Sequence, residues 1–167
     1  MQLGIFSIQV GYLLVFLFMI IFYRLFGLIA NIALIFNLIM ILAIMSLIGS
    51  ALTLPGIAGS VLTIGMAVDA NVLIFERIRE ELANGARPKS AIVAGFNRAF
   101  TSIFDAQLTT LIVAFILFAI GTGPIKGFAV TLAIGIASSI FTSVTVTRAL
   151  VQLAYGYRKN VKRLSIG

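Results

Sequence analysis

The chain of 167 residues is 61% hydrophobic and only 10% charged, with a mean hydropathy of +1.17. Soluble domains carry roughly 25% charged residues, so this composition excludes a water-soluble globular protein and predicts an integral membrane protein. The net charge of +7 lies beside apolar segments, which indicates membrane topology rather than nucleic-acid binding. There is no Cys and no His. The usual zinc ligands and Ser-His catalysis are therefore missing, and we expect neither an enzyme nor a metal site.

Five apolar segments are long enough to cross about 30 Å of hydrocarbon as helices. Charges or chain breakers separate them: Arg24 and Gly27 follow the first span, 49–56 follows the second and 121–127 follows the fourth. The sequence therefore predicts an all-α, polytopic membrane protein with a single transmembrane domain over residues 1–167. The predicted spans are 5–23, 28–48, 57–75, 103–120 and 128–146.

The segment 76–102, between the third and fourth spans, is rich in charge. Its first part continues the third span as a charged helix that stops near Asn84 and Gly85, and Pro88 suits the first position of a new helix. From there an apolar face forms, which predicts an amphipathic helix lying along the membrane surface. That face consists of Ile92, Phe96, Ala99, Phe100 and Ile103. Residues 155–167 form a short basic tail.

Basic residues gather on one side of the membrane if the five spans alternate in direction. Ten of them share the side of segment 76–102, and Lys126 alone lies opposite. The positive-inside rule then predicts a cytoplasmic C-terminus and a periplasmic N-terminus. The ten are Arg24, Arg77, Arg79, Arg87, Lys89, Arg98, Arg158, Lys159, Lys162 and Arg163.

An acidic residue, Asp69, lies inside the third span. A charge near the centre of a spanning helix costs about 2.5–3.5 kcal/mol, so such a residue usually has a role. At 100° per residue Ala58, Gly65, Val72 and Glu76 share its sector, where small side chains let a neighbouring helix approach closely. Two interpretations stay open: an acid that gains and loses a proton during transport, and a packing acid hydrogen-bonded to a neighbouring helix.

The fifth span carries a stripe of small and hydroxyl side chains. Thr131, Gly135, Ser138, Thr142 and Thr145 recur at intervals that keep them on one helical face. This pattern favours a packing seam between helices. The alternative is that the hydroxyls serve a protonatable group on an adjacent helix.

A second acid, Asp105, lies in the first turn of the predicted fourth span, within Phe104-Asp105-Ala106-Gln107-Leu108-Thr109-Thr110. A carboxylate there suits the positive end of the helix dipole, so a structural cap and a functional role are both open. Arg148 closes the fifth span near the same membrane face, where snorkelling is an adequate explanation. We expect an ion pair between Asp105 and Arg148.

Several motifs, in this order, resemble the SecD/SecF family of protein-export membrane subunits in the RND superfamily, and its SecD branch in particular. Together they cover essentially the whole chain beyond the first few residues. They are Leu54-Pro55-Gly56-Ile57-Ala58-Gly59, the run MAVDANVLIFERIREE at 66–81, the segment around Asp105 quoted above, and GTGPIKGFA at 121–129.

The resemblance implies one RND-type half-bundle that works with a SecF-like second half beside the SecYEG translocon, in the lipid bilayer of the bacterial cytoplasmic (inner) membrane. Flow of protons, or of sodium ions, would couple the proton-motive force to protein export, with no other cofactor. Family members carry an additional first helix and a large periplasmic domain that contacts the exported unfolded polypeptide. This chain begins about where their second helix would, so we expect that domain to be absent from it.

Asp69 matches the intramembrane acid of the family, so the resemblance assigns proton translocation to it. Asp105, Thr109 and Thr110 match a second motif whose role is less specific. Further candidates for relay or structural polar partners are Asn71, Glu76, Ser138, Thr142 and Arg148. Two other functions stay open: an assembly subunit that docks to the translocon without proton coupling, and half of an RND-type small-molecule efflux transporter.

Overall fold

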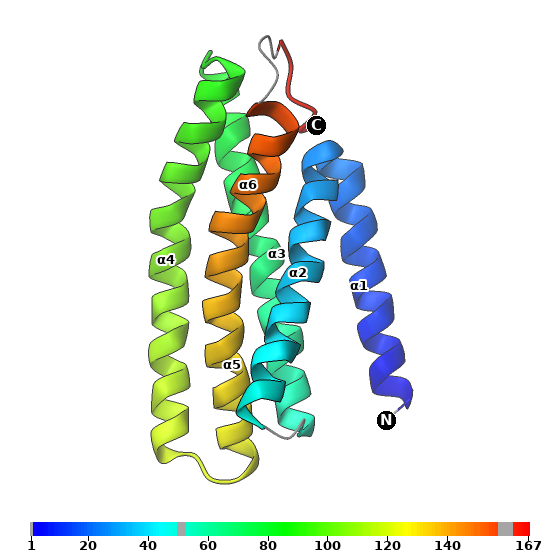
Figure 1. Ribbon diagram of the computed structural model, residues 1–167, viewed down its shortest axis with the longest axis vertical. Helices are drawn as coiled ribbons and strands as arrows, with labels where there is room; N and C mark the ends of the chain where they lie inside the picture. The colour runs from blue at the N-terminus through cyan, green and yellow to red at the C-terminus, as the bar shows by residue number, and fades with distance from the viewer. Residues whose placement is uncertain (1, 50–52, 157–161) are drawn as a thin grey trace.

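The chain folds into an antiparallel bundle of five long helices in a computed structural model that describes residues 2–49, 53–156 and 162–167 (Figure 1). The fifth helix continues past Phe141 through two π-helical turns. Each long helix is apolar enough to cross a membrane, which confirms the predicted all-α fold and its five spans. The elements are α1 (Gln2–Tyr23), α2 (Leu25–Ile48), α3 (Leu54–Ala83), α4 (Pro88–Ile120), α5 (Pro124–Phe141), η1 (Thr142–Val146), α6 (Thr147–Val151) and η2 (Gln152–Gly156).

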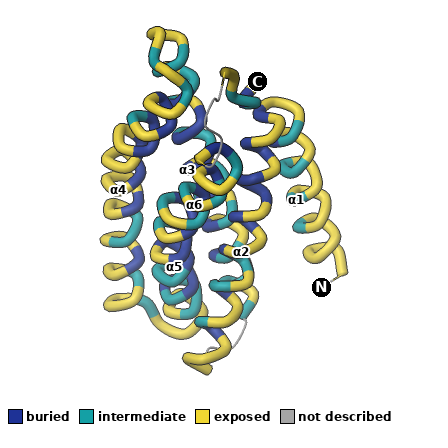
Figure 2. The backbone as a smooth tube through the Cα atoms, turned by 45° about the horizontal axis from the view of Figure 1, so that its top comes forward, coloured by how far each residue is buried: buried dark blue, intermediate teal, exposed yellow. Residues whose placement is uncertain are grey.

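Helix α3 lies at the centre of the bundle and packs against both α4 and α5, whereas α1 packs mainly against α2 at the edge. The α3–α5 contact is close because small residues face each other across it. A Cβ atom on Gly135 would lie 2.3 Å from Thr63 Cγ2, and one on Gly59 would lie 3.3 Å from Thr131 Cβ. Figure 2 shows that α1 is exposed along most of its length, in contrast to the buried faces of α3 and α5. Helix packing through small residues is typical of membrane bundles.

Helix α3 begins three residues before the predicted start of the third span. Thr53 caps it, because its Oγ1 accepts a hydrogen bond of 3.2 Å from the Gly56 N–H, and Pro55 occupies the first turn. Proline is favoured there because its missing N–H would be unsatisfied anyway. The predicted turn over 49–56 is therefore too long at its C-terminal end; residues 50–52 lie outside the described residues.

The structure corrects the prediction of a separate surface helix over 88–102. This segment and the fourth span form one continuous helix, α4. Its apolar face is buried within the bundle except for the exposed Phe100, and a Cβ on Gly95 would lie 2.4 Å from Ile78 Cγ1 on α3. An ion pair of 2.5 Å between Arg98 and Glu81 joins the same two helices.

The last residues return to the α1–α2 turn. The Phe26 N–H donates to the Ser165 carbonyl at 3.5 Å, the Ser165 N–H donates to the Tyr155 hydroxyl at 3.0 Å, and Ile166 is buried. Thus the end of the predicted basic tail packs onto the bundle. Arg158 and Lys159 of that tail lie outside the described residues.

Candidate functional site

Asp69 lies on α3 at a cleft of about 160 Å³ between α3 and α4. Its side chain is exposed, and in the described part of the chain no hydrogen bond or ion pair holds its carboxylate. Of the other residues of its sector, Ala58, Gly65 and Glu76 are exposed as well, and Val72 is half-buried. The predicted sector is therefore an open face of this chain, and no packing bond of the kind expected for a structural acid forms within the described bundle.

The opposite wall of this cleft comes from α4. Ser102, Gln107 and Thr110 line it, so hydroxyl and amide groups share the cleft with Asp69. Gln107 is 4% exposed, and its Oε1 has no hydrogen-bond partner in the described structure. A buried amide without a partner costs free energy and is uncommon outside functional or hydrated sites. Gln107 lies in the motif around Asp105, but its inward position could be found only from the register of α4 against α3.

Asn71 lies on the other side of α3 from Asp69, since two residues correspond to about 200° around a helix. It is 3% exposed and its Oδ1 accepts a hydrogen bond of 2.9 Å from Thr147 Oγ1 on α6. The structure therefore separates Asn71 from the cleft. Its bond to Thr147 ties α3 to α6.

Thr131 and Gly135 of the stripe on the fifth span lie on the α3–α5 contact, as expected for a packing seam, and Ser138 and Thr142 are buried. Thr142 Oγ1 donates to the Ser138 carbonyl at 2.9 Å, and Ser138 Oγ is buried without a partner in the described residues. Thr145 departs from the stripe and is exposed. The π turn η1 adds a residue to the turn, so Thr147 takes the inward position and donates to the Thr142 carbonyl at 3.2 Å.

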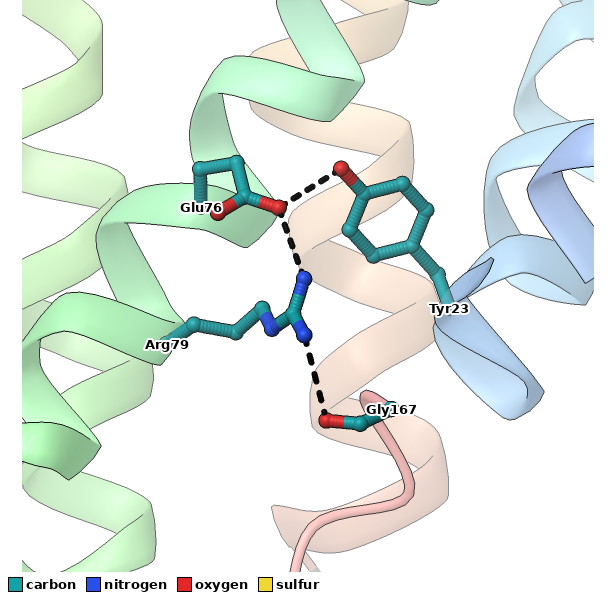
Figure 3. Close-up of polar contacts among 4 residues, drawn as sticks. All are labelled: Tyr23, Glu76, Arg79 and Gly167. Carbon is teal, nitrogen blue, oxygen red and sulfur yellow. Dashed lines mark hydrogen bonds and ion pairs between the residues drawn. The ribbon is translucent and has the colours of Figure 1, made fainter. Parts of the chain in front are cut away.

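Glu76 belongs to a polar cluster toward the basic end of the bundle (Figure 3). Its Oε1 accepts hydrogen bonds from the Tyr23 hydroxyl at 2.8 Å and from Arg79 Nη1 at 2.9 Å. Arg79 also donates to the Gly167 carbonyl at 3.5 Å. Glu76 thus joins α1, α3 and the end of the tail, and its contacts do not extend to the Asp69 cleft.

The structure corrects two predictions about Asp105. It lies in the middle of α4, well past the first turn that begins at Pro88, so it does not face the helix dipole's positive end. It is exposed and forms no ion pair with Arg148, whose Cζ lies 6.0 Å from the centre of the Phe96 ring. Thr109 Oγ1 only donates to the Asp105 carbonyl at 3.0 Å, a bond within one helix.

Thr110 is the residue of this motif that does reach the cleft, although its Oγ1 donates to the Ala106 carbonyl at 3.2 Å. Of the candidates from the sequence, the structure therefore brings Asp69 and Thr110 together, and it adds Gln107. Asn71, Ser138 and Thr142 are buried and do not line this cleft, and Glu76, Asp105 and Arg148 lie apart from it as well.

Comparisons with known proteins bear on this arrangement. The family model described as "Protein export membrane protein SecD/SecF, C-terminal" matches residues 1–156. Protein translocase subunit SecD of Pseudomonas aeruginosa is 64% identical over 148 residues, which are 89% of this chain and 24% of that protein. Protein translocase subunit SecD of Escherichia coli is 59% identical over 164 residues, which are 98% of this chain and 26% of that protein.

The fold agrees with a solved structure of the same kind. The crystal structure of SecDF from Thermus thermophilus, described as a translocon-associated membrane protein, superposes with a TM-score of 0.89 at 43% identity. The superposition covers 93% of this chain and 22% of that one. This chain therefore spans about a quarter of the length of the relatives it matches. By sequence and by fold, it belongs to the SecD/SecF family, in its SecD branch, and corresponds to the C-terminal membrane part.

Proposed function

We propose that this chain is the membrane part of a SecD-type translocase subunit that couples the proton-motive force to export of proteins across the bacterial inner membrane. The observation that carries this proposal is the position of Asp69, an acid inside a spanning helix, on a cleft with Gln107 and Thr110. Acids within spanning segments mark ion pathways and proton relays. We orient the bundle by the positive-inside rule, so that its basic end is cytoplasmic and its N-terminus is periplasmic.

Exposure of the Asp69 sector supports the presence of a second half. Ala58 and Gly65 are small and exposed on the same face of α3 as Asp69. Such a face in a membrane protein suits close approach of another helix bundle. We assign this place to a SecF-like second half, in line with the pseudo-symmetric repeats of other transporters. The SecYEG translocon and the exported polypeptide are the further partners in this proposal.

Proton movement supplies enough energy for such coupling. Moving one charge across 100 mV is worth about 2.3 kcal/mol, which changes a two-state equilibrium about 50-fold. When Asp69 is charged, the cleft offers hydroxyl and amide groups that can turn toward its carboxylate. When it is protonated that attraction weakens, so protonation can bias how α3 sits against α4.

The test is Asp69→Asn in the full-length protein, assembled with its second half and the translocon in inverted membrane vesicles. The variant keeps the size of the side chain and removes the titrating group. We expect normal co-purification with the partners and loss of the stimulation of export by the proton-motive force. Glu80→Gln is the matched control, since Glu80 is an exposed acid on the same helix and pairs with Arg77 at 2.8 Å.

Full stimulation in Asp69→Asn would reject the coupling role and favour an assembly subunit. Loss of drug resistance with normal export in the same variant would favour a small-molecule efflux half. A sodium gradient imposed in place of the proton gradient identifies the coupling ion, because carboxylate and amide oxygens also suit sodium.

A further inference from the structure

A second cleft, of about 180 Å³, lies at the basic end of the bundle between α4 and the α6–η2 segment. These elements lie side by side, α4 in green and α6 in orange, in Figure 1. The cleft's floor and walls are mostly apolar, and among the described residues that line it Lys89 and Arg148 are the only charged ones. Its main lining residues are Lys89, Ile92, Val93, Arg148, Val151 and Tyr155.

The two cations lack an acidic partner in the described structure. Lys89 Nζ contacts the Gly156 carbonyl at 3.5 Å, and Arg148 lies over the Phe96 ring. Glu81, an acid on α3, is paired with Arg98. A cation inside a spanning helix is costly unless an anion or carbonyl group compensates it. Lys89 has the Gly156 carbonyl, whereas among the described residues neither an anion nor a carbonyl compensates Arg148. Charge complementarity therefore indicates an anionic occupant for this cleft.

The apolar lining identifies the kind of anion. Val93 is 47% exposed, and together with the buried Ile92 it forms an apolar wall of the cleft on α4. A free phosphate ion would gain nothing from this wall, whereas an acyl chain would bury it. We infer that the cleft binds an anionic phospholipid, with its phosphate between Lys89 and Arg148 and an acyl chain along the α4 wall.

The depth of the two cations fits a headgroup. Arg148 precedes Gly156, at the end of η2, by eight residues, or about 12 Å along the helix axis. Its guanidinium lies over the Phe96 ring, and Lys89 lies nearer the surface at the start of α4, so the two cations border the cleft at different depths. Basic pockets between spanning helices on the cytoplasmic side bind anionic headgroups, and the positive-inside rule places this end in that leaflet.

The experiment is native mass spectrometry of the full-length protein, delipidated in detergent and titrated with phosphatidylglycerol or phosphatidylcholine. We expect selective retention of phosphatidylglycerol by the unmodified protein. Lys89→Gln/Arg148→Gln should weaken that binding roughly 25-fold, since each surface cation contributes about fivefold to anionic-lipid affinity. Val93→Trp, which fills the cleft at unchanged charge, should also reduce retention.

The matched control is Arg87→Gln/Arg163→Gln, which removes the same charge from exposed positions at the same end, outside the cleft. It should retain the lipid like the unmodified protein. Equal losses in both double variants would overturn the site in favour of general surface charge. Undiminished binding in Lys89→Gln/Arg148→Gln would overturn it as well. Displacement of the lipid by millimolar inorganic phosphate would identify a free-phosphate site instead. None of these readouts depends on proton coupling at Asp69.

Discussion

Replacing Gly135 by Ala is expected to push α5 away from α3. The new Cβ would lie 2.3 Å from Thr63 Cγ2, 2.5 Å from its Cβ and 2.6 Å from its Oγ1, all far below van der Waals separation. Thr63 cannot easily yield, because it is fully buried, β-branched and hydrogen-bonded through Oγ1 to the Ser60 carbonyl at 2.9 Å. The helices themselves must therefore move.

The magnitude follows from two opposing effects. Overpacking a close contact costs about 1–3 kcal/mol, and three clashing atoms place Gly135→Ala toward the upper part of that range. Ala is favoured over Gly inside a helix by about 0.8–1.0 kcal/mol, which offsets part of the cost. We expect a net loss of about 1–2 kcal/mol in the free energy of unfolding.

Reversible unfolding by SDS in mixed micelles measures this loss, with helical circular dichroism as the signal. Gly65→Ala is the matched control: it makes the same substitution inside α3, where a new Cβ meets nothing within 4 Å. It should leave stability unchanged or raise it by up to about 1 kcal/mol. Equal shifts of the unfolding midpoint in the two variants would refute the close-packed α3–α5 seam.

Three other hydrogen bonds give further predictions in the same assay. Thr147→Val removes the donor to Asn71 and should lower the free energy of unfolding by about 0.6–1.7 kcal/mol. A double-mutant cycle with Asn71→Leu isolates the interaction of this pair. Additive effects of the two substitutions would contradict the hydrogen bond. Tyr23→Phe removes the 2.8 Å bond to Glu76 and should cost about 0.5–1.5 kcal/mol. Thr109 carries an exposed hydroxyl that bonds within α4. Thr109→Val should therefore change the free energy of unfolding by no more than about 0.5 kcal/mol, and a larger loss would contradict the exposed position of Thr109.

Hydrophobicity and length were sufficient to predict five spanning helices, because the bilayer requires about 20 apolar residues for each crossing. They were insufficient for segment 88–102. An apolar helical face is equally satisfied by lipid and by a protein neighbour, so periodicity alone cannot distinguish a surface helix from a packed one. The buried contact of Gly95 with Ile78 decides this point, and it requires the position of α3.

Predictions about the polar residues also succeeded within one helix and failed between helices. Periodicity placed Asp69 with Ala58 and Gly65 correctly, since they lie on one helix. It failed for Asp105 and Arg148, because their separation depends on the register of two helices. It also failed at Thr145, because the π turn η1 shifts the following residues by one position, and nothing in the sequence of 142–146 predicts that turn.

The sequence by itself determined the class of protein, the number of spans, the asymmetry of basic charge and the presence of one acid within a span. All of these depend on composition and on contacts within one helix. Only the tertiary structure showed that Asp69 shares a cleft with Gln107, that Asn71 belongs to a different contact, and that Lys89 and Arg148 face a common apolar cleft. Each of these joins residues far apart in the chain, and their meeting depends on how helices cross and rotate against one another.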